Sequence, residues 1–235
     1  MFRLTRHGFR EMLIGSVVLA VVALGLGLAW WPLAILVAPV LVWLFAFFRD
    51  PERKLPSNVN SFVSPADGVV SDITEIAHDD LLGGPAVRIG IFLSVFNVHI
   101  NRSPCDGRVI KVTYRKGKFI NAMKHNEASE ENESNTVVLA DENTAEPIAV
   151  VKQIVGLIAR RIIFTPAEGD TLKRGQRIGM IKFGSRTELY ISARLSPKVV
   201  VRVGQSVRGA ADVIAVIGQG VDEEFEPLVS RNTPA

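Results

Sequence analysis

The stretch MLIGSVVLAVVALGLGLAWWPLAILVAPVLVWLFAFF, residues 12–48, divides the sequence into two parts of different character. Its 37 consecutive residues carry no charge, whereas one crossing of the membrane core takes about 20 residues of helix. The run is therefore too long for a single straight span. Pro32 interrupts it directly after two tryptophans, which favours a hairpin of two short helices, about Met12 to Ala29 and Leu33 to Phe48.

Basic residues flank both ends of this apolar run. They are Arg3, Arg6 and Arg10 before it and Arg49, Arg53 and Lys54 after it. Because positive charge is retained on the cytoplasmic side, we expect a bacterial-type inner (plasma) membrane protein with its second part in the cytoplasm. A secretory signal peptide is disfavoured, since its apolar region spans about 7 to 15 residues. A single tilted span stays open as an alternative, because Pro39 interrupts the second helix.

The second part, residues 49–235, is long enough to bury a sizeable core without disulfides or metals. It carries 24 Lys and Arg against 23 Asp and Glu. A net charge this small cannot neutralise a phosphate backbone, so no nucleic-acid partner is expected. The single cysteine, Cys105, permits no intrachain disulfide and leaves the redox compartment open.

Short β-branched segments separated by glycine-bearing turns fill this second part. They are Gly68–Val70, Ala86–Ile89, Gly107–Val112, Ala149–Val151 and Val199–Val201. The pattern predicts a mainly β fold, a compact barrel-sandwich-like domain with few short helices, preceded by the N-terminal transmembrane helical hairpin. Residues 118–135 break the pattern and predict a loop or short helix longer than an ordinary connection. The polar tail from Gln219 is expected to be loosely held.

Two short patterns each occur twice. Ser-Pro-x-Asp-Gly stands at 64–68 and at 103–107, each time directly before a predicted strand, as a tight turn requires. Gly169 to Gly175 and Gly204 to Gly209 are similarly spaced glycine corners, each followed by an apolar segment. Such corners resemble those of biotinyl and lipoyl carrier domains in architecture only.

A Gly-Ser step lies between two predicted strands, in the sequence GMIKFGSRTELYIS, residues 179–192. By itself this dipeptide is typical of a turn. Lys182, three residues before Ser185, is a conceivable amine nucleophile, but strand alternation favours a solvent-facing residue there.

Several stretches together resemble the phosphatidylserine decarboxylase family, in its short, membrane-anchored, pyruvoyl-dependent form. These stretches are FFRDP (47–51), PADG (65–68), FLSVFNVHINR (92–102), ARRI (159–162) and FGS (183–185). They follow the family's order and extend from Phe47 to about Gly209.

The resemblance implies a proenzyme that cuts itself between Gly184 and Ser185. An anchor of residues 1–48 would precede a catalytic domain of residues 49–235, and cleavage would give a large chain 1–184 and a small chain 185–235. Ser185 would attack the uncrowded carbonyl of Gly184 and end as a pyruvoyl group. No separate cofactor, neither a metal nor pyridoxal phosphate, would then be needed.

A serine hydroxyl needs an adjacent base that is itself oriented by a third group. His99 stands at the family's motif histidine and Asp67 at the aspartate of PADG, so the resemblance implies an arrangement like the hydrolase triad in role. Taken singly, an Asp before Gly is ordinarily a turn residue, and a lone His in a strand is more often structural. Asn97 stands where some members carry a second histidine.

The implied reaction is conversion of phosphatidylserine to phosphatidylethanolamine and carbon dioxide. A Schiff base between the substrate amine and the pyruvoyl carbonyl would take up the electrons left on the α-carbon, and His99 would return a proton there. The candidates to bind the substrate phosphate are Arg102, Arg160 and Arg161. Residues 127–133 resemble the family's loop near the catalytic site, with Ser134 where arginine is expected, although a solvated acidic surface is the alternative.

The partners expected are phosphatidylserine, membrane lipid and the protein's own two chains, and a homo-oligomer stays open. Cys105, His78 and His125 lack the paired spacing of zinc ligands, so no metal site is predicted. Two other function classes remain. A membrane-anchored β-barrel adaptor or carrier would stay uncut, and a cell-wall metallopeptidase would require a histidine pair that the sequence lacks.

Overall fold

The protein is described by a computed structural model, which covers residues 3–118, 129–156, 161–182 and 185–218. The chain forms two compact units. The first comprises Met1–Glu52 together with Phe96–Val98, and the second comprises Arg53–Val95 together with His99–Ala235.

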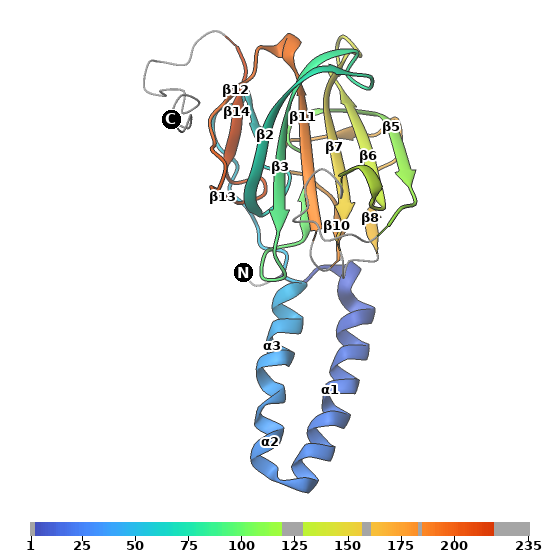
Figure 1. The fold of residues 1–235 in the computed structure, drawn as a ribbon, viewed down its shortest axis with the longest axis vertical. Coiled ribbons are helices and arrows are strands. Elements are labelled where there is room, and N and C mark those ends of the chain that lie inside the picture. The colour runs from blue at the N-terminus through green and yellow to red at the C-terminus, as the bar shows by residue number, and fades with distance from the viewer. Residues whose placement is uncertain (1–2, 119–128, 157–160, 183–184, 219–235) are drawn as a thin grey trace, which may run out of the picture. The chain divides into compact units, whose positions relative to one another are not determined.

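The first unit is a helical hairpin (Figure 1). After a short 3-10 helix η1 (Arg6–Gly8), its helices are α1 (Phe9–Ala29), α2 (Trp31–Ile35) and α3 (Val37–Phe47). The apolar helix pair expected from the sequence is thereby confirmed. Within the described ranges, Arg6–Ala29 is the helical stretch with the length and apolar composition of a membrane span, and Trp31–Phe47 is a shorter apolar one.

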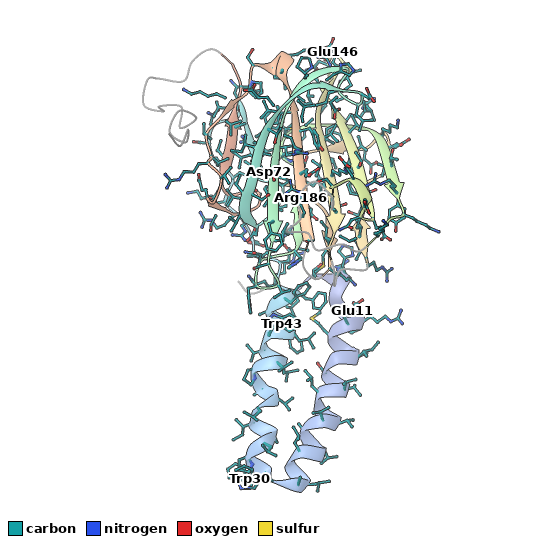
Figure 2. All side chains as sticks on the ribbon, viewed as in Figure 1. Glu11, Trp30, Trp43, Asp72, Glu146 and Arg186 are labelled. Atoms are coloured by element: carbon teal, nitrogen blue, oxygen red, sulfur yellow. The ribbon has the colours of Figure 1, made fainter. Side chains whose placement is uncertain are left out.

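The break between the two arms of the hairpin lies at Trp30, two residues earlier than expected. Its extended backbone (φ −164°, ψ 108°) ends α1, and the residue sits at the turn in Figure 2. Pro32 instead lies in the first turn of α2, where a missing N–H costs no helical hydrogen bond. A second interruption at Leu36 separates α2 from α3.

Backbone hydrogen bonds join the two ends of the hairpin. Thr5 N donates to Phe48 O over 2.9 Å and Asp50 N donates to Arg3 O over 2.7 Å. Gly15 approaches the Leu44 side chain so closely that an added Cβ would lie 2.7 Å from a Leu44 methyl. Small residues thus let the helices pack tightly where their ends meet.

The second unit is a β domain. Its first strands are β1 Ser61–Val63, β2 Gly68–Asp79, β3 Gly84–Leu93, β4 Ile100–Arg102, β5 Gly107–Arg115, β6 Ser134–Ala140 and β7 Pro147–Val155. The later ones are β8 Ile162–Phe164, β9 Thr171–Leu172, β10 Arg177–Ile181, β11 Ser185–Ser192, the 3-10 helix η2 Ala193–Leu195, β12 Lys198–Val199, β13 Ser206–Val207 and β14 Val213–Val216. The mainly β prediction is confirmed.

Eight strands form one large antiparallel sheet in the order β13-β2-β3-β11-β7-β6-β5-β9, which curls around the core (Figure 1). Two three-stranded sheets, β1-β14-β12 and β4-β10-β8, accompany it. Strand β11 is central, because β3 pairs with it over Ser185–Ser192 and β7 pairs with it over Ser185–Ile191.

The hydrophobic core lies against the inner face of the large sheet. Alternate residues of the central strands supply it, for example Ile89 and Ile91 from β3, Val151 from β7, and Leu189 and Ile191 from β11. Successive strand residues point to opposite faces, so Arg186 and Glu188 lie on the other face. The sheet thus presents a mostly apolar inner face and a partly charged outer one.

The two Ser-Pro-x-Asp-Gly turns lie beside each other and bond symmetrically. Arg102 N donates to Pro65 O of the first turn, and Val63 N donates to Pro104 O of the second, both over 2.9 Å. Each turn therefore holds the strand that leads into the other. Both turns open a strand as predicted, since β2 begins at Gly68 and β5 at Gly107.

The glycine corners complete the same repeat. Asp67 Oδ1 accepts from Gly209 N, and Asp106 Oδ1 accepts from Arg174 N, both over 2.8 Å. The strand pairing repeats as well. β1 pairs with β14 and β4 pairs with β10, both antiparallel and each with a register shift. The second unit is consequently built from two similar halves, each of which uses one turn pattern and one glycine corner.

Two local expectations need revision, and two segments cannot be compared with their predictions. The segment Val199–Val201 is strand only at Val199, although Val200 N still donates to Ile214 O over 3.1 Å. The break in the β pattern expected over 118–135 ends before Ser134, because β6 pairs with β7 from that residue. Residues 119–128 and the tail from Gln219 lie outside the described residues.

Replacing Ile89 by Ala should destabilise the β domain by about 2–5 kcal/mol, since this fully buried side chain would leave a cavity in the core. The measurement is the denaturant midpoint of the strand signal in circular dichroism, made on detergent-solubilised protein. Val203→Ala is the control, because Val203 is exposed and should shift the midpoint little. Equal shifts in both variants would contradict the assignment of Ile89 to the core.

Candidate active site

Ser185 is the first residue of β11 and is completely buried. Its backbone is fixed on both sides, by Leu93 of β3 and by Val155 of β7. Within the described part of the chain its Oγ has no hydrogen-bond partner. Phe183 and Gly184 lie outside the described residues. A buried hydroxyl without a partner is costly, so this atom is a candidate for chemistry rather than for stability.

His99 lies next to the end of the strand that leads to Ser185. The His99 side chain is buried, and its carbonyl accepts from Ile181 N, the last residue of β10, over 3.2 Å. Asn60 occupies the equivalent place in the other half of the domain, where its carbonyl accepts from Ile217 N over 2.9 Å. The repeated backbone pattern thus carries a histidine in only one of its two copies.

Asp67 is the fourth residue of the first Ser-Pro-x-Asp-Gly turn and is held at both carboxylate oxygens. Arg53 Nη2 donates to Oδ2 over 2.6 Å, and Gly209 N donates to Oδ1 over 2.8 Å. The following Gly68 is required because a Cβ there would collide with the carbonyl oxygen of Phe92. These contacts fix the position of the carboxylate and satisfy part of its charge.

The strand register places Asp67 and Ser185 at the same end of the large sheet. Val69 of β2 pairs with Phe92 of β3, and Phe92 pairs with Arg186 of β11. On β2 the residue before Val69 is Gly68, which follows Asp67. On β11 the residue before Arg186 is Ser185. His99 joins this end through Ile181. The structure therefore gathers the three predicted residues at one end of the domain, and their catalytic roles stay predictions.

A row of buried polar side chains continues inward from this end. Asn101 Nδ2 donates to Thr187 Oγ1 over 3.0 Å, Gln153 Nε2 donates to Asn101 Oδ1 over 2.9 Å, and Asn135 Nδ2 donates to Gln153 Oε1 over 3.1 Å. Sequence reasoning missed this row. The available signal was spacing, since Thr187 follows Ser185 by two residues and thus shares its face of the strand.

The arginines proposed for phosphate binding have different surroundings. Arg102 is buried, and its Nη1 donates to Gly175 O over 3.1 Å. Arg161 is exposed, and its carbonyl accepts from Lys182 N over 3.2 Å. Arg160 lies outside the described residues. Contacts of these arginines with substrate stay predictions.

Lys182 is buried, with 4% of its surface exposed, so the expectation of a solvent-facing side chain is wrong. Alternation does not apply at this position, because β10 ends at Ile181. Moreover, Met180 and Ile181 are consecutive and both fully buried, which shows that this part of β10 is covered on both faces.

The outer face behind Ser185 carries a buried cluster of charges. Arg186 and Glu188 are both 0% exposed, and Arg186 Nε donates to Glu188 Oε1 over 2.9 Å. Arg186 Nη2 donates to Asp72 Oδ2 over 2.6 Å, and Nη1 donates to Ser71 Oγ over 2.5 Å. Figure 2 labels Asp72 and Arg186, which lie close together on the sheet. One arginine thus joins β11 to β2 across β3.

Opposing effects act on the carboxylates of this cluster. Burial by itself would raise the pKa of Glu188, but the Arg186 guanidinium and the Ser129 hydroxyl hold that pKa below its usual value. The same balance of burial against Arg186 lowers the pKa of Asp72. Burial lowers the pKa of Lys152, despite the attraction of Glu188. The carboxylates of Asp72 and Glu188 are therefore ionised at neutral pH.

Residues 129–133, the described part of the glutamate-rich stretch 127–133, pack on this cluster. Ser129 Oγ donates to Glu188 Oε1, and Lys152 Nζ donates to Ser129 O over 2.8 Å. Asn132 Nδ2 donates to the carbonyl of Val155, the residue that pairs with Ser185. The solvated alternative fits Glu130 and Glu131, which are exposed, but Ser129 and Asn132 are buried beside the candidate site.

Among the described residues, His, Cys, Asp and Glu side chains form no group of three or more that could hold a metal ion. Cys105 is buried, and burial raises the pKa of its thiol. His125 lies outside the described residues, and His78 is exposed on β2 beside Asp80, with 3.4 Å between Nε2 and Oδ1.

Comparison with known proteins gives matches over most of this chain. The family model for phosphatidylserine decarboxylase matches residues 41–215. The chain belongs to the phosphatidylserine decarboxylase family. The resemblance inferred from the sequence motifs is confirmed, as is the expectation of an enzyme of the carboxy-lyase class. The matched region includes every residue of the candidate triad.

Relatives of this phosphatidylserine decarboxylase family cover most of the chain. A protein of Rhodopirellula baltica is 45% identical over 218 residues, which are 92% of this chain and 88% of the relative. One from Carboxydothermus hydrogenoformans is 46% identical over 194 residues, 83% of this chain and 88% of the relative. One from Ruegeria pomeroyi is 42% identical over 203 residues, 84% and 90% respectively. Each is named a phosphatidylserine decarboxylase proenzyme.

Acid should destabilise the fold through Asp72 and Glu188. Because their folded-state pKa values are lowered, their contribution to the free energy of unfolding is complete above the unfolded pKa of about 4 and is lost as the pH falls through the lower, folded value. The denaturant midpoint should therefore fall from pH 5 to pH 3, more steeply in the wild type than in Glu188→Gln. Glu52→Gln, whose parent side chain is exposed, should keep the wild-type slope. Equal slopes in all three proteins would contradict the prediction.

Proposed function

We propose that the protein is a self-processing, pyruvoyl-dependent decarboxylase that converts phosphatidylserine to phosphatidylethanolamine and carbon dioxide. The observation that carries the proposal is the Ser185 hydroxyl, buried and without a partner in the described structure, at the start of a strand that is paired on both sides. The name proenzyme, borne by the relatives, supports processing.

Cleavage would begin with attack of Ser185 Oγ on the carbonyl carbon of Gly184. The peptide C–N bond breaks, the hydroxyl proton passes to the departing nitrogen, and an ester forms. Removal of the Ser185 α-proton then expels the ester oxygen, so Gly184 keeps a carboxylate and residue 185 becomes unsaturated. After the proton shifts to carbon, water displaces ammonia and leaves a ketone on residue 185. Atoms and electrons balance without an external oxidant.

His99 and Asp67 supply the proton transfers in this proposal. His99 accepts the Ser185 hydroxyl proton, because a serine is a weak nucleophile at neutral pH without a base. Asp67, held by Arg53 and Gly209 N, orients the imidazole and stabilises its charged form. Support comes from the register, which brings all three residues to one end of the sheet.

The decarboxylation step uses the same end of the sheet. The ketone of residue 185 condenses with the substrate amine and accepts the electron pair that remains when carbon dioxide leaves. His99 then returns a proton to the α-carbon. The buried amides of Asn101 and Gln153 make this interior polar enough for a headgroup, and Arg102, Arg160 and Arg161 remain the candidates for its phosphate.

The helical hairpin would place the enzyme at its substrate. A diacyl lipid stays in the bilayer, so a tether raises the local substrate concentration. The apolar stretch Arg6–Ala29 and the basic residues at both ends of the hairpin support an inner (plasma) membrane location with the catalytic domain on the cytoplasmic side. The partners in this proposal are phosphatidylserine, membrane lipid and the two chains made by cleavage.

Ser185→Ala should abolish both cleavage and decarboxylation, because the attacking oxygen is lost. Intact mass should show two chains for the wild type, residues 1–184 and residues 185–235 with a blocked N-terminus, and a single chain for the variant. Ser206→Ala, which changes an exposed serine on β13, should be processed normally. Wild-type protein that stays whole yet releases carbon dioxide would overturn the proposal.

His99→Ala should leave mostly uncut precursor, with processing slowed by about 10²- to 10⁴-fold through loss of the base. Asp67→Asn should also slow processing, because the His99 imidazole would lose the carboxylate that orients it and stabilises its charged form. The rate is followed on a denaturing gel after the protein is purified, with His78→Ala as the control, since His78 is exposed. Normal processing of His99→Ala would require a different base.

A further inference from the structure

On the proposed function, β11 must hold a reacting group at the extreme end of a chain. After cleavage residue 185 is the first residue of the small chain, and chain ends are usually poorly ordered. A ketone-bearing residue also has no backbone N–H to donate to a neighbouring strand. The pairing of residue 185 with Leu93 and Val155 therefore loses both chain continuity and a donor on activation.

The side chain of the next residue compensates for this loss. Arg186 is fully buried on the face opposite Ser185. Among the described residues, its guanidinium reaches Glu188 on its own strand and Ser71 and Asp72 on β2. Because β3 lies between β11 and β2, these bonds span a strand. They hold the first residues of β11 to β2, a strand that cleavage does not cut.

The sheet makes room for this contact at Gly90. Asp72 and Glu188 both pair with Gly90 of β3, so the carboxylates stand on either side of a position without a side chain. A Cβ on Gly90 would lie 2.6 Å from Arg186 Cζ. Gly90 has no positive φ that would otherwise require glycine. The space is thus shaped for the arginine.

Stability of the fold by itself does not call for a buried arginine here. Elsewhere the same outer face is covered by apolar residues, with Ala86, Val138 and Val150 packed under Leu82. Replacing a buried ion pair by apolar residues is often neutral or stabilising, whereas the pair is useful for fixing one arrangement. The cluster occupies the part of the face directly behind the cleavage site.

We propose that Arg186 is a positioning residue, whose bonds to Asp72, Ser71 and Glu188 keep residue 185 aligned with the site after the chain is cut. Within the described residues, these bonds lead away from the reacting Ser185, to side chains on the opposite face of the sheet. Arg186 acts through the strand, by holding the end of β11 against β3 and β7 when the covalent connection to residue 184 is gone.

The test compares cut and uncut protein, because a merely structural role would affect both. Hydrogen exchange of the peptide covering residues 185–192 is measured by mass spectrometry in Arg186→Gln, once in the purified cut protein and once in an uncut Ser185→Ala background. In the cut protein exchange should be at least about tenfold faster than in the wild type, since charge-assisted hydrogen bonds are lost. In the uncut background the change should stay within about threefold.

Activity provides the second readout. The cut Arg186→Gln protein should lose about tenfold or more in kcat with KM within about twofold, because binding groups remain while the reacting carbonyl is displaced. Arg186→Lys should recover part of kcat, as it keeps the charge without the planar fork. Gly90→Ala, which keeps every charge and displaces the guanidinium, should reproduce the effect of Arg186→Gln.

Arg88→Gln is the matched control. Arg88 lies on β3, a strand that is not cut, and its Nη2 is 3.3 Å from Oδ1 of the same Asp72. Its effect on exchange should be equal in cut and uncut protein. Equal effects of Arg186→Gln in both forms, or folded Arg186→Gln and Gly90→Ala proteins that fail to cut themselves, would overturn the proposal. A wild type of one chain by intact mass would instead contradict the proposed function itself.

Discussion

The pairing of β11 with β3 on one edge and β7 on the other is the constraint on which the candidate site depends. It begins at Ser185 and runs along the strand without a register shift. Because side chains alternate along a strand, this register sends Ser185 and Thr187 inward and Arg186 and Glu188 outward. A slip of one residue would exchange the faces and bury the charges in the apolar core.

The second constraint is the repeat of turn and glycine corner. Each half of the β domain holds an aspartate on a backbone N–H and ties a carbonyl to the end of a returning strand. The candidate site takes Asp67 from one copy and His99 from the other, whose counterparts are Asp106 and Asn60. Similar backbones thus provide a rigid frame, and a few side chains distinguish the end that contains Ser185.

The charged cluster behind Ser185 links the scaffold to the proposed chemistry. Burying charge is costly unless each partner is satisfied. In the described part of the chain Arg186 bonds to Glu188, Ser71 and Asp72, and Glu188 also accepts from Ser129 and Tyr190. A protein that cuts its own central strand converts an interior residue into a chain end. Side-chain bonds across the neighbouring strand are a direct way to keep that end in place.

The amino-acid sequence determined the broad organisation, the family and the candidate residues. A helix satisfies the backbone hydrogen bonds of a long uncharged run within the run itself, and β-branched segments between glycine turns favour strands. The spaced motifs marked Ser185, His99 and Asp67. Tertiary structure decided the rest, including the buried state of Lys182 and the contact of Arg186 with Asp72, 114 residues away. Local periodicity describes the two faces of one element, whereas burial and ion pairing depend on which distant strands come to lie beside it.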